Sequence, residues 1–203
     1  MEKKIIITIG REFGSGGRQI GKQLADMLGI EYYDKELIYL ASKESGLCTE
    51  FFEKADEKKA GSLLQAFALG FSMNNAGMIS NDYLSNESLF KIQADVIQKL
   101  AKEKSCIFVG RCADYILRNE KHCTNLFIHA TQDDRIHRIQ ERHNLSAQEA
   151  QELIHKTDKS RAGYYNYYTD KTWGAASSYD LTINSSILGL ARTAEFIKTF
   201  IER

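Results

Sequence analysis

A glycine-rich segment directly after a short apolar run constrains the fold of this 203-residue chain most strongly. Residues 5–9 read Ile-Ile-Ile-Thr-Ile and end at Gly10. A β-branched run of this kind predicts a strand buried on both faces, as the central strands of parallel sheets are. From Gly17 onward, apolar side chains recur at every fourth residue until Gly29, which predicts an amphipathic helix with a glycine C-cap. The chain therefore begins as strand, glycine loop and helix.

Strands and helices alternate along the rest of the sequence. Further strands are predicted at 30–33, 106–109, 125–129 and 179–184. Helices are predicted at 35–44, within 49–68, in a long segment capped by Ser85 or Asn86, from the caps Thr131 and Ser146, and at 187–201, with an irregular stretch at 70–86. Strands separated by helices of about ten or more residues form βαβ units. We therefore expect a three-layer α/β domain with about five parallel strands flanked by helices.

The composition excludes several classes of protein. Lys+Arg 27 balances Asp+Glu 27, so the chain has no overall field that would attract nucleic acid or an anionic membrane. No run approaches the roughly 20 apolar residues of a membrane span. We expect a cytoplasmic protein without a nucleic-acid or membrane partner. The cysteines and histidines lack the spacing of a metal site, and free thiols are expected at Cys48, Cys106, Cys112 and Cys123.

Four segments follow directly on predicted strands, at 10–18, Asp34, 110–111 and 130–138. In open parallel sheets, ligands bind beyond the carboxyl ends of the strands, and three of these segments contain arginine. The first segment joins a strand to a helix, where backbone N–H groups and the helix N-terminus can cradle phosphate. We interpret it as a phosphate-binding loop with these contact residues: Arg11, Gly14, Ser15, Gly16, Gly17, Arg18 and Gln19.

The loop departs from the Walker A pattern GxxxxGK[ST]. Gly17 stands where that pattern has lysine, and Arg18 and Gln19 follow. The charge of the β- and γ-phosphates must then be met elsewhere, and Arg18 is the first candidate because a guanidinium can bind phosphate bidentately. The magnesium ligand of the missing Ser/Thr would come from Gln19 or from ordered water. The metal ligands therefore stay unassigned.

Residues 7–18 and 29–38 resemble the opening of the cytidylate kinase-like family, a branch of the nucleoside monophosphate kinases among the P-loop NTPases. The resemblance covers essentially the whole chain and is weakest between Thr49 and Lys104. Further matches follow in the same order at 109–111, 126–130, Arg135, Arg138, 158–161 and 173–184.

The resemblance implies one cytidylate kinase-like domain over 1–203 with a P-loop NTPase-like fold, a helical acceptor-side insert at 49–104 and a helical lid at 135–173. It implies transfer of the γ-phosphoryl group of ATP, with Mg²⁺, to a nucleoside monophosphate such as CMP or dCMP. Residues 14–19 would then hold the ATP phosphates, and Arg111 would hold the phosphate of the acceptor. Asp34 would lie on the acceptor side. The catalytic arginines would be Arg18 and, in the lid, Arg135, Arg138 and Arg161.

Other interpretations stay open. The missing lysine is compatible with a nucleotide-binding regulatory protein that has lost catalysis. The chain contains no proline, whereas orthodox cytidylate kinases carry prolines in the glycine loop and after the lid arginine, so the base of the nucleotide stays open. The acceptor could also be another phosphorylated or hydroxylated metabolite, because related P-loop kinases diverge in the acceptor-binding region. The lid arginines could instead pair with acidic neighbours on their own helices, as Arg161 would with Asp158.

The tyrosines near the end of the predicted lid are expected to pack rather than to stack on a base. They are Tyr164, Tyr165, Tyr167 and Tyr168. The sequence is compatible with a monomer and with a homo-oligomer.

Overall fold

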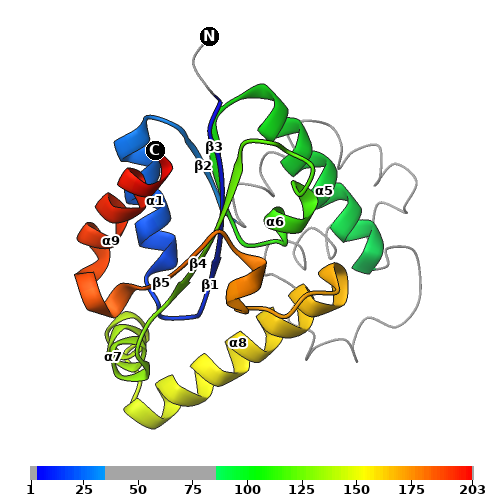
Figure 1. Ribbon diagram of the computed structural model, residues 1–203. Coiled ribbons are helices and arrows are strands. Elements are labelled where there is room, and N and C mark those ends of the chain that lie inside the picture. The colour runs from blue at the N-terminus through cyan, green and yellow to red at the C-terminus, as the bar shows by residue number, and fades with distance from the viewer. Residues whose placement is uncertain (1–3, 35–85, 203) are drawn as a thin grey trace.

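The structure is a computed structural model that describes residues 4–34 and 86–202. Five parallel strands form one sheet in the order β2-β3-β1-β4-β5 (Figure 1). The strands are β1 (Ile6–Arg11), β2 (Glu31–Tyr33), β3 (Cys106–Val109), β4 (Cys123–His129) and β5 (Leu181–Asn184). The predicted α/β class and parallel sheet are confirmed.

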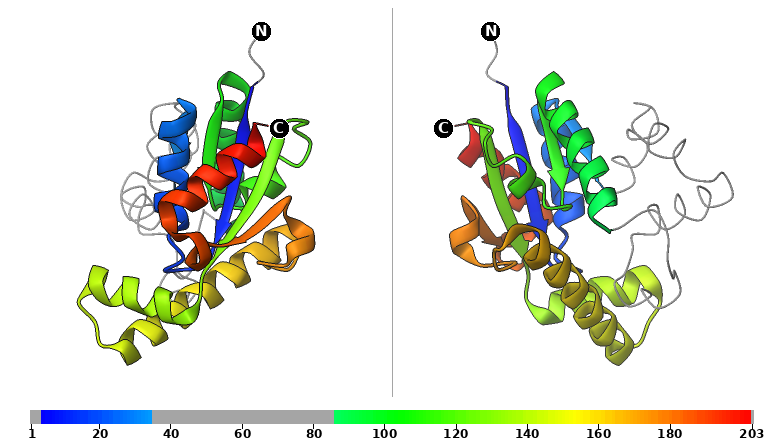
Figure 2. Two further views of the ribbon diagram at one scale, coloured as in Figure 1. Left: turned by 60° about the vertical axis from the view of Figure 1, so that its left-hand side comes forward. Right: turned by 90° about the vertical axis from the view of Figure 1, so that its right-hand side faces the viewer.

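Helices cover both faces of the sheet, and Figure 2 shows the three layers from two further sides. Helices α1 and α9 lie on one face, and α5 and α6 lie on the other. Helices α7 and α8 form a hairpin across the carboxyl ends of the strands. The helices are α1 (Gly17–Leu28), α5 (Asn86–Glu103), α6 (Ala113–Ile116), α7 (Gln132–His143), α8 (Ala147–Thr169) and α9 (Ser185–Ile201), with a short 3₁₀ turn η2 (Ala176–Ser178) before β5.

The apolar run at the start of the chain is buried on both faces, as its composition predicts. Ile7 and Ile9 pack with Leu24 of α1 and Ile197 of α9 in one core. Ile6 packs into the second core, on the side of α5 and α6. This run is buried against two helical layers, which fixes the position of its last residues. The glycine loop that follows therefore lies at the carboxyl ends of the strands.

Several predicted element boundaries are confirmed by their capping geometry. Thr131 is the N-cap of α7. Ser146 forms a capping box with Glu149 at the start of α8. Ser185 begins a helical turn earlier than predicted, because the side chain of Asn184 accepts from the backbone N–H of Ser186 and caps it there. A kink at Gly189, with φ 74° and ψ 170°, separates this turn from the rest of α9.

Two elements differ from the prediction. Strand β1 continues through Gly10 to Arg11, because both residues still pair with β4. The short helix α6 was not predicted. It follows a turn in which Arg111 and Cys112 have positive φ values, which these residue types do not predict. The predicted helices at 35–44 and 49–68, the irregular stretch at 70–85 and most of the insert at 49–104 lie outside the described residues.

None of the helices in the described part of the chain combines the length and the apolar character needed to cross a bilayer. Cys106, Cys112 and Cys123 are free thiols, as expected, and Cys48 lies outside the described residues. Burial raises the pKa of each of these three thiols to about 12, so they are protonated at neutral pH.

Candidate functional site

The glycine loop between β1 and α1 contains backbone N–H groups that could bind an anion. Gly14 and Gly16 adopt left-handed conformations, with φ values of 82° and 79°. Among residues 4–34 and 86–202, no acceptor meets the backbone N–H groups of these two glycines. The first turn of α1 contains no acidic residue. Free N–H groups at a helix N-terminus attract an anion, so the loop has the geometry of a phosphate cradle.

The α7–α8 hairpin holds the carbonyl side of this loop. Arg138 Nη1 donates to the carbonyl oxygen of Gly14 at 3.0 Å, and Arg135 Nε donates to that of Phe13 at 2.7 Å. The backbone N–H of Phe13 donates to Asp158 Oδ1 at 2.8 Å. These three contacts fix the backbone of Phe13 and Gly14 against the hairpin.

Arg135 is enclosed by carboxylates. Its guanidinium pairs with Asp158 and lies 3.3 Å from Glu12 Oε2, and only 8% of the residue is exposed. Glu12 also accepts from the backbone N–H of Ala130 at 3.2 Å. Arg135 thus joins the glycine loop, α7 and α8 in one buried network, and its role at the phosphates stays a prediction.

Arg18 and Asp34, both singled out from the sequence, contact each other. Arg18 Nη2 lies 2.7 Å from Asp34 Oδ2, and the arginine side chain is 62% exposed while the aspartate side chain is 7% exposed. This pair ties the first turn of α1 to the end of β2. The side chain of Arg18 therefore points toward the carboxylate of Asp34 after β2.

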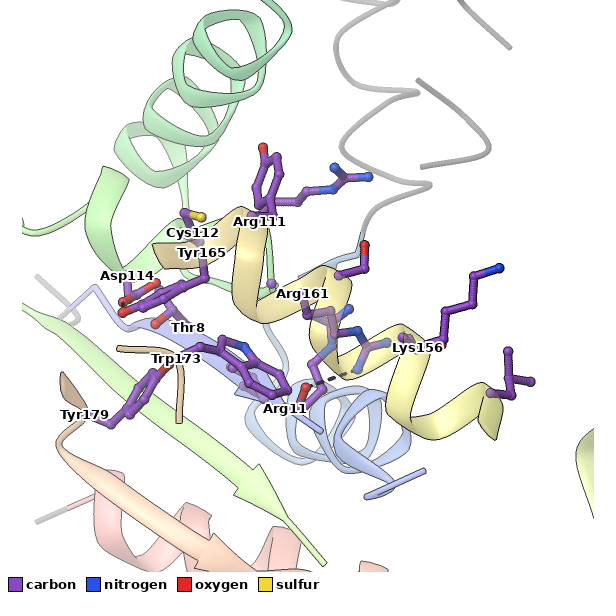
Figure 3. A pocket seen from close by; sticks show the side chains of 18 residues that line it. Thr8, Arg11, Arg111, Cys112, Asp114, Lys156, Arg161, Tyr165, Trp173 and Tyr179 are labelled. Carbon is purple, nitrogen blue, oxygen red and sulfur yellow. Dashed lines mark hydrogen bonds between the residues drawn. The ribbon is translucent and has the colours of Figure 1, made fainter. Parts of the chain in front are cut away.

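Three arginines from separate segments line one pocket of about 420 Å³ beyond the carboxyl ends of the strands. Figure 3 shows Arg11 and Arg161 side by side and Arg111 at some distance from them. Arg11 ends β1, Arg111 follows β3, and Arg161 projects from α8, where its Nη1 donates to the carbonyl oxygen of Arg11 at 3.0 Å. Lys156 of α8 also lines this pocket. Within the described part of the chain, no carboxylate forms an ion pair with any of these four side chains.

The positive charges of the arginines in this pocket repel one another. Burial, and then the positive charges of Arg161 and Arg111, lower the pKa of the Arg11 guanidinium. Burial likewise lowers the pKa of Arg161. A bound anion would relieve this repulsion, so the pocket is suited to a phosphate group.

The other end of the pocket is aromatic and acidic. Tyr165 donates a 2.7 Å hydrogen bond to Asp114 Oδ2, and burial raises the pKa of this carboxyl. Trp173 and Tyr179 complete this end, where both pack against Phe127. Figure 3 shows Asp114, Tyr165 and Tyr179 together, away from Lys156.

Asp114 and Lys156 were not among the site residues predicted from the sequence. Asp114 follows the Gly-Arg pair after β3 by three residues, so its place near a strand end was a usable signal. Lys156 lies in the middle of α8. Its orientation depends on how that helix packs across the sheet, which spacing alone does not reveal.

The tyrosines near the end of α8 pack mainly against other rings. Tyr168 stacks on Phe90 of α5 with ring centroids 4.2 Å apart, and Tyr164 leans against Tyr168 at 4.8 Å. The packing prediction is confirmed for these two residues, although Tyr164 also lines the pocket. Among the described residues, no group of three or more His, Cys, Asp or Glu side chains could hold a metal ion.

A family model described as the cytidylate kinase-like family matches residues 6–187. The crystal structure of an uncharacterized protein from Eubacterium ventriosum ATCC 27560 is 27% identical, with a TM-score of 0.74 over 98% of this chain and 99% of that chain. No protein in a search of curated proteins matches this chain.

Two shikimate kinases are similar in fold. The enzyme from Bacteroides thetaiotaomicron is 12% identical, with a TM-score of 0.54 over 98% of this chain and 99% of that chain. The enzyme from Acinetobacter baumannii, solved in complex with shikimate, is 15% identical, with a TM-score of 0.52 over 99% of this chain and 94% of that chain. The sheet order and flanking helices thus match P-loop kinase structures.

Proposed function

This chain belongs to the cytidylate kinase-like family, and we propose that it transfers the γ-phosphoryl group of ATP to a nucleoside monophosphate, with CMP and dCMP as the first candidates. The observation that carries the proposal is that Arg11, Arg111 and Arg161 line one pocket beside the glycine loop. Phosphoryl transfer depends on positioning two anionic substrates and neutralising their oxygens. A ring of arginines from separate segments performs that task.

On the donor side, the N–H groups of Gly14, Gly16 and the first turn of α1 would hold the phosphates of ATP. Magnesium usually keeps several waters and binds through substrate phosphates with one or two carboxylates. When bound, Mg²⁺ would neutralise charge on the phosphates.

On the acceptor side, Arg111 would bind the phosphate of the nucleotide. The opposite end of the pocket offers the aromatic surfaces of Trp173 and Tyr179 and the carboxyl group of Asp114. Aromatic faces suit a base, and a carboxylate accepts hydrogen bonds from an amino or hydroxyl group. Asp34 remains a predicted acceptor-side residue, which would act in company with Arg18.

Residues 135–173 would act as the lid of a single domain over 1–203, with 49–104 as the acceptor-side insert. Helix α8 supplies Lys156, Arg161 and Tyr164 to the pocket wall and so covers its outer side. A covered pocket excludes water, which would otherwise hydrolyse ATP. Arg135 and Arg138 would contribute by fixing the glycine loop beneath the lid.

The test is a coupled ADP-release assay with MgATP and a panel of acceptors. The panel contains CMP, dCMP, UMP, AMP, GMP and shikimate, with a no-acceptor control. We expect strong stimulation by CMP or dCMP. Stimulation by shikimate alone would replace the nucleotide with a hydroxylated metabolite, and ATP binding without any product would favour a regulatory protein that has lost catalysis.

A further inference from the structure

The Cβ and Cγ atoms of Arg11 lie where the Cβ atom of a Walker lysine at position 17 would have to fit. Gly17 stands at the lysine position of the glycine loop. A Cβ atom added to Gly17 would lie 2.7 Å from Cβ and 3.1 Å from Cγ of Arg11, and 3.5 Å from Cβ of Ile128. The 2.7 Å contact is closer than real Cβ atoms approach one another, and the 3.1 Å contact is tight. A lysine at position 17 would therefore collide with the first carbons of the Arg11 side chain in this backbone.

A second glycine makes room for the far end of the same side chain. Gly110 has a φ value of 83°, and a Cβ added there would collide with the guanidinium of Arg11. The Arg11 side chain thus extends from beside Gly17 to beside Gly110, and it lines the pocket at the carboxyl end of β1. Two positions without side chains enclose one arginine.

The charges distinguish Arg11 from Arg18. In the part of the chain that the structure describes, no carboxylate forms an ion pair with Arg11, and Arg111 and Arg161 lie near it as further cations. Arg18 lies 2.7 Å from the carboxylate of Asp34 and is 62% exposed. An anion gains more from an enclosed cation without a carboxylate partner than from an exposed one that is already paired.

We propose that Arg11, rather than Arg18, supplies the phosphate-binding charge that lysine supplies in the Walker A loop. The inference rests on the proposed function insofar as the anion is the phosphate chain of a nucleotide. It explains why the loop contains glycine at position 17: the cation comes from the end of the strand instead of the start of the helix. The exchange keeps one positive charge in the pocket beyond the strand ends, with the guanidinium beside Gly110, and moves its anchor by six residues along the sequence, from 17 to 11.

The first test measures binding of inorganic tripolyphosphate to the full-length protein by isothermal titration calorimetry. We expect Arg11→Met to weaken binding by about tenfold or more, since a hydrogen bond to a charged group commonly contributes that much. Arg18→Met should have a smaller effect. Arg142→Met, an exposed arginine on α7, is the matched control for loss of one positive charge. The inference is overturned if Arg18→Met loses more affinity than Arg11→Met, or if the wild-type protein does not bind the probe.

A compensating pair tests the shared space directly. Arg11→Gly should weaken tripolyphosphate binding, and Gly17→Lys alone should also weaken it because the new side chain collides with Arg11. The double variant Arg11→Gly with Gly17→Lys should recover at least about tenfold over Arg11→Gly, because removal of the Arg11 side chain opens the space for lysine. Thermal unfolding of each variant checks that it is folded. A double variant that is folded and binds no better than Arg11→Gly contradicts the inference.

The acceptor assay separates this inference from the proposed function. Loss of tripolyphosphate binding in Arg11→Met, together with no product from any acceptor, would refute the kinase and leave the role of Arg11 in place. Rapid CMP phosphorylation with unchanged tripolyphosphate binding in Arg11→Met would refute the role of Arg11 and leave the kinase in place.

Discussion

The guanidinium of Arg138 on α7 donates a 3.0 Å hydrogen bond to the carbonyl oxygen of Gly14 in the glycine loop. This contact ties the proposed lid to the loop that would hold ATP. It also makes the order of the loop dependent on a residue outside it.

Arg138→Ala should therefore weaken ATP binding. We expect the KM for ATP to rise by about tenfold, because a hydrogen bond from a charged donor contributes about 1.5–3 kcal/mol. Arg142→Ala, exposed near the end of the same helix, is the control and should leave the KM unchanged. Equal KM values for ATP in the two variants would show that the contact does not order the loop.

Gly14→Ala should disturb the loop more than a left-handed glycine elsewhere does. Its Cβ would lie 2.9 Å from the backbone oxygen of Arg135, and its φ value is 82°. Gly29, with a φ value of 63° and no atom within 4 Å of an added Cβ, provides the matched control. Each alanine should cost about 1–2 kcal/mol of unfolding free energy for the left-handed backbone, but only Gly14→Ala should also reduce ATP affinity. Urea unfolding and calorimetric titration measure the two effects.

Arg111→Met should raise the KM for the acceptor. The side chain follows β3 and lines the pocket, so its loss removes a charged contact to the proposed acceptor phosphate. We expect an increase of at least about tenfold, with a much smaller change in the KM for ATP. Arg118→Met, which removes an exposed arginine that rests on Tyr115, is the control. A larger effect on ATP than on the acceptor would assign Arg111 to the donor side.

The buried carboxyl of Asp114 should make stability depend on pH. Burial raises its pKa above the ordinary value of 3.8. The folded protein therefore holds this proton more tightly than the unfolded chain does, so the contribution of Asp114 to stability falls as pH rises from 3.8 through the raised pKa. Asp114→Asn removes this pH-dependent contribution to stability and keeps an acceptor for the Tyr165 hydroxyl.

The free energy of unfolding of Asp114→Asn, relative to the wild type, should then increase with pH over that range and level off above it. Denaturant unfolding at a series of pH values measures the difference. A difference that is flat with pH, or that decreases as pH rises, would contradict the assignment.

Much of the fold follows from local patterns in the sequence. The run Ile6, Ile7 and Ile9 fills two cores at once, which is why a β-branched sequence here indicates a central strand. The side chain of Ser146 accepts from the backbone N–H of Glu149 and defines the start of α8 by chemistry that acts within a few residues. Thr131 takes the N-cap position of α7 without a side-chain capping hydrogen bond. Helix α6 was missed because only four residues, after an unusual left-handed pair, form it.

The site was predicted less completely, because its residues come from distant segments. The position of Arg111 after a predicted strand was sufficient to place it at the carboxyl ends of the strands. The pairing of Arg18 with Asp34 depends on how α1 and β2 pack, and nothing in the sequence near position 18 reveals it. Likewise, the contribution of Lys156 to the pocket arises from the path of α8 over the strand ends.

The most direct measurement is the formation of CDP from CMP and radiolabelled MgATP, with the products separated by chromatography, for the wild-type protein and for Arg111→Met. The account predicts label in CDP for the wild type, and a rate at low CMP that is lower by at least about tenfold in the variant. Absence of labelled CDP from the wild type, while ATP is bound, would contradict the proposal that this chain is a cytidylate kinase.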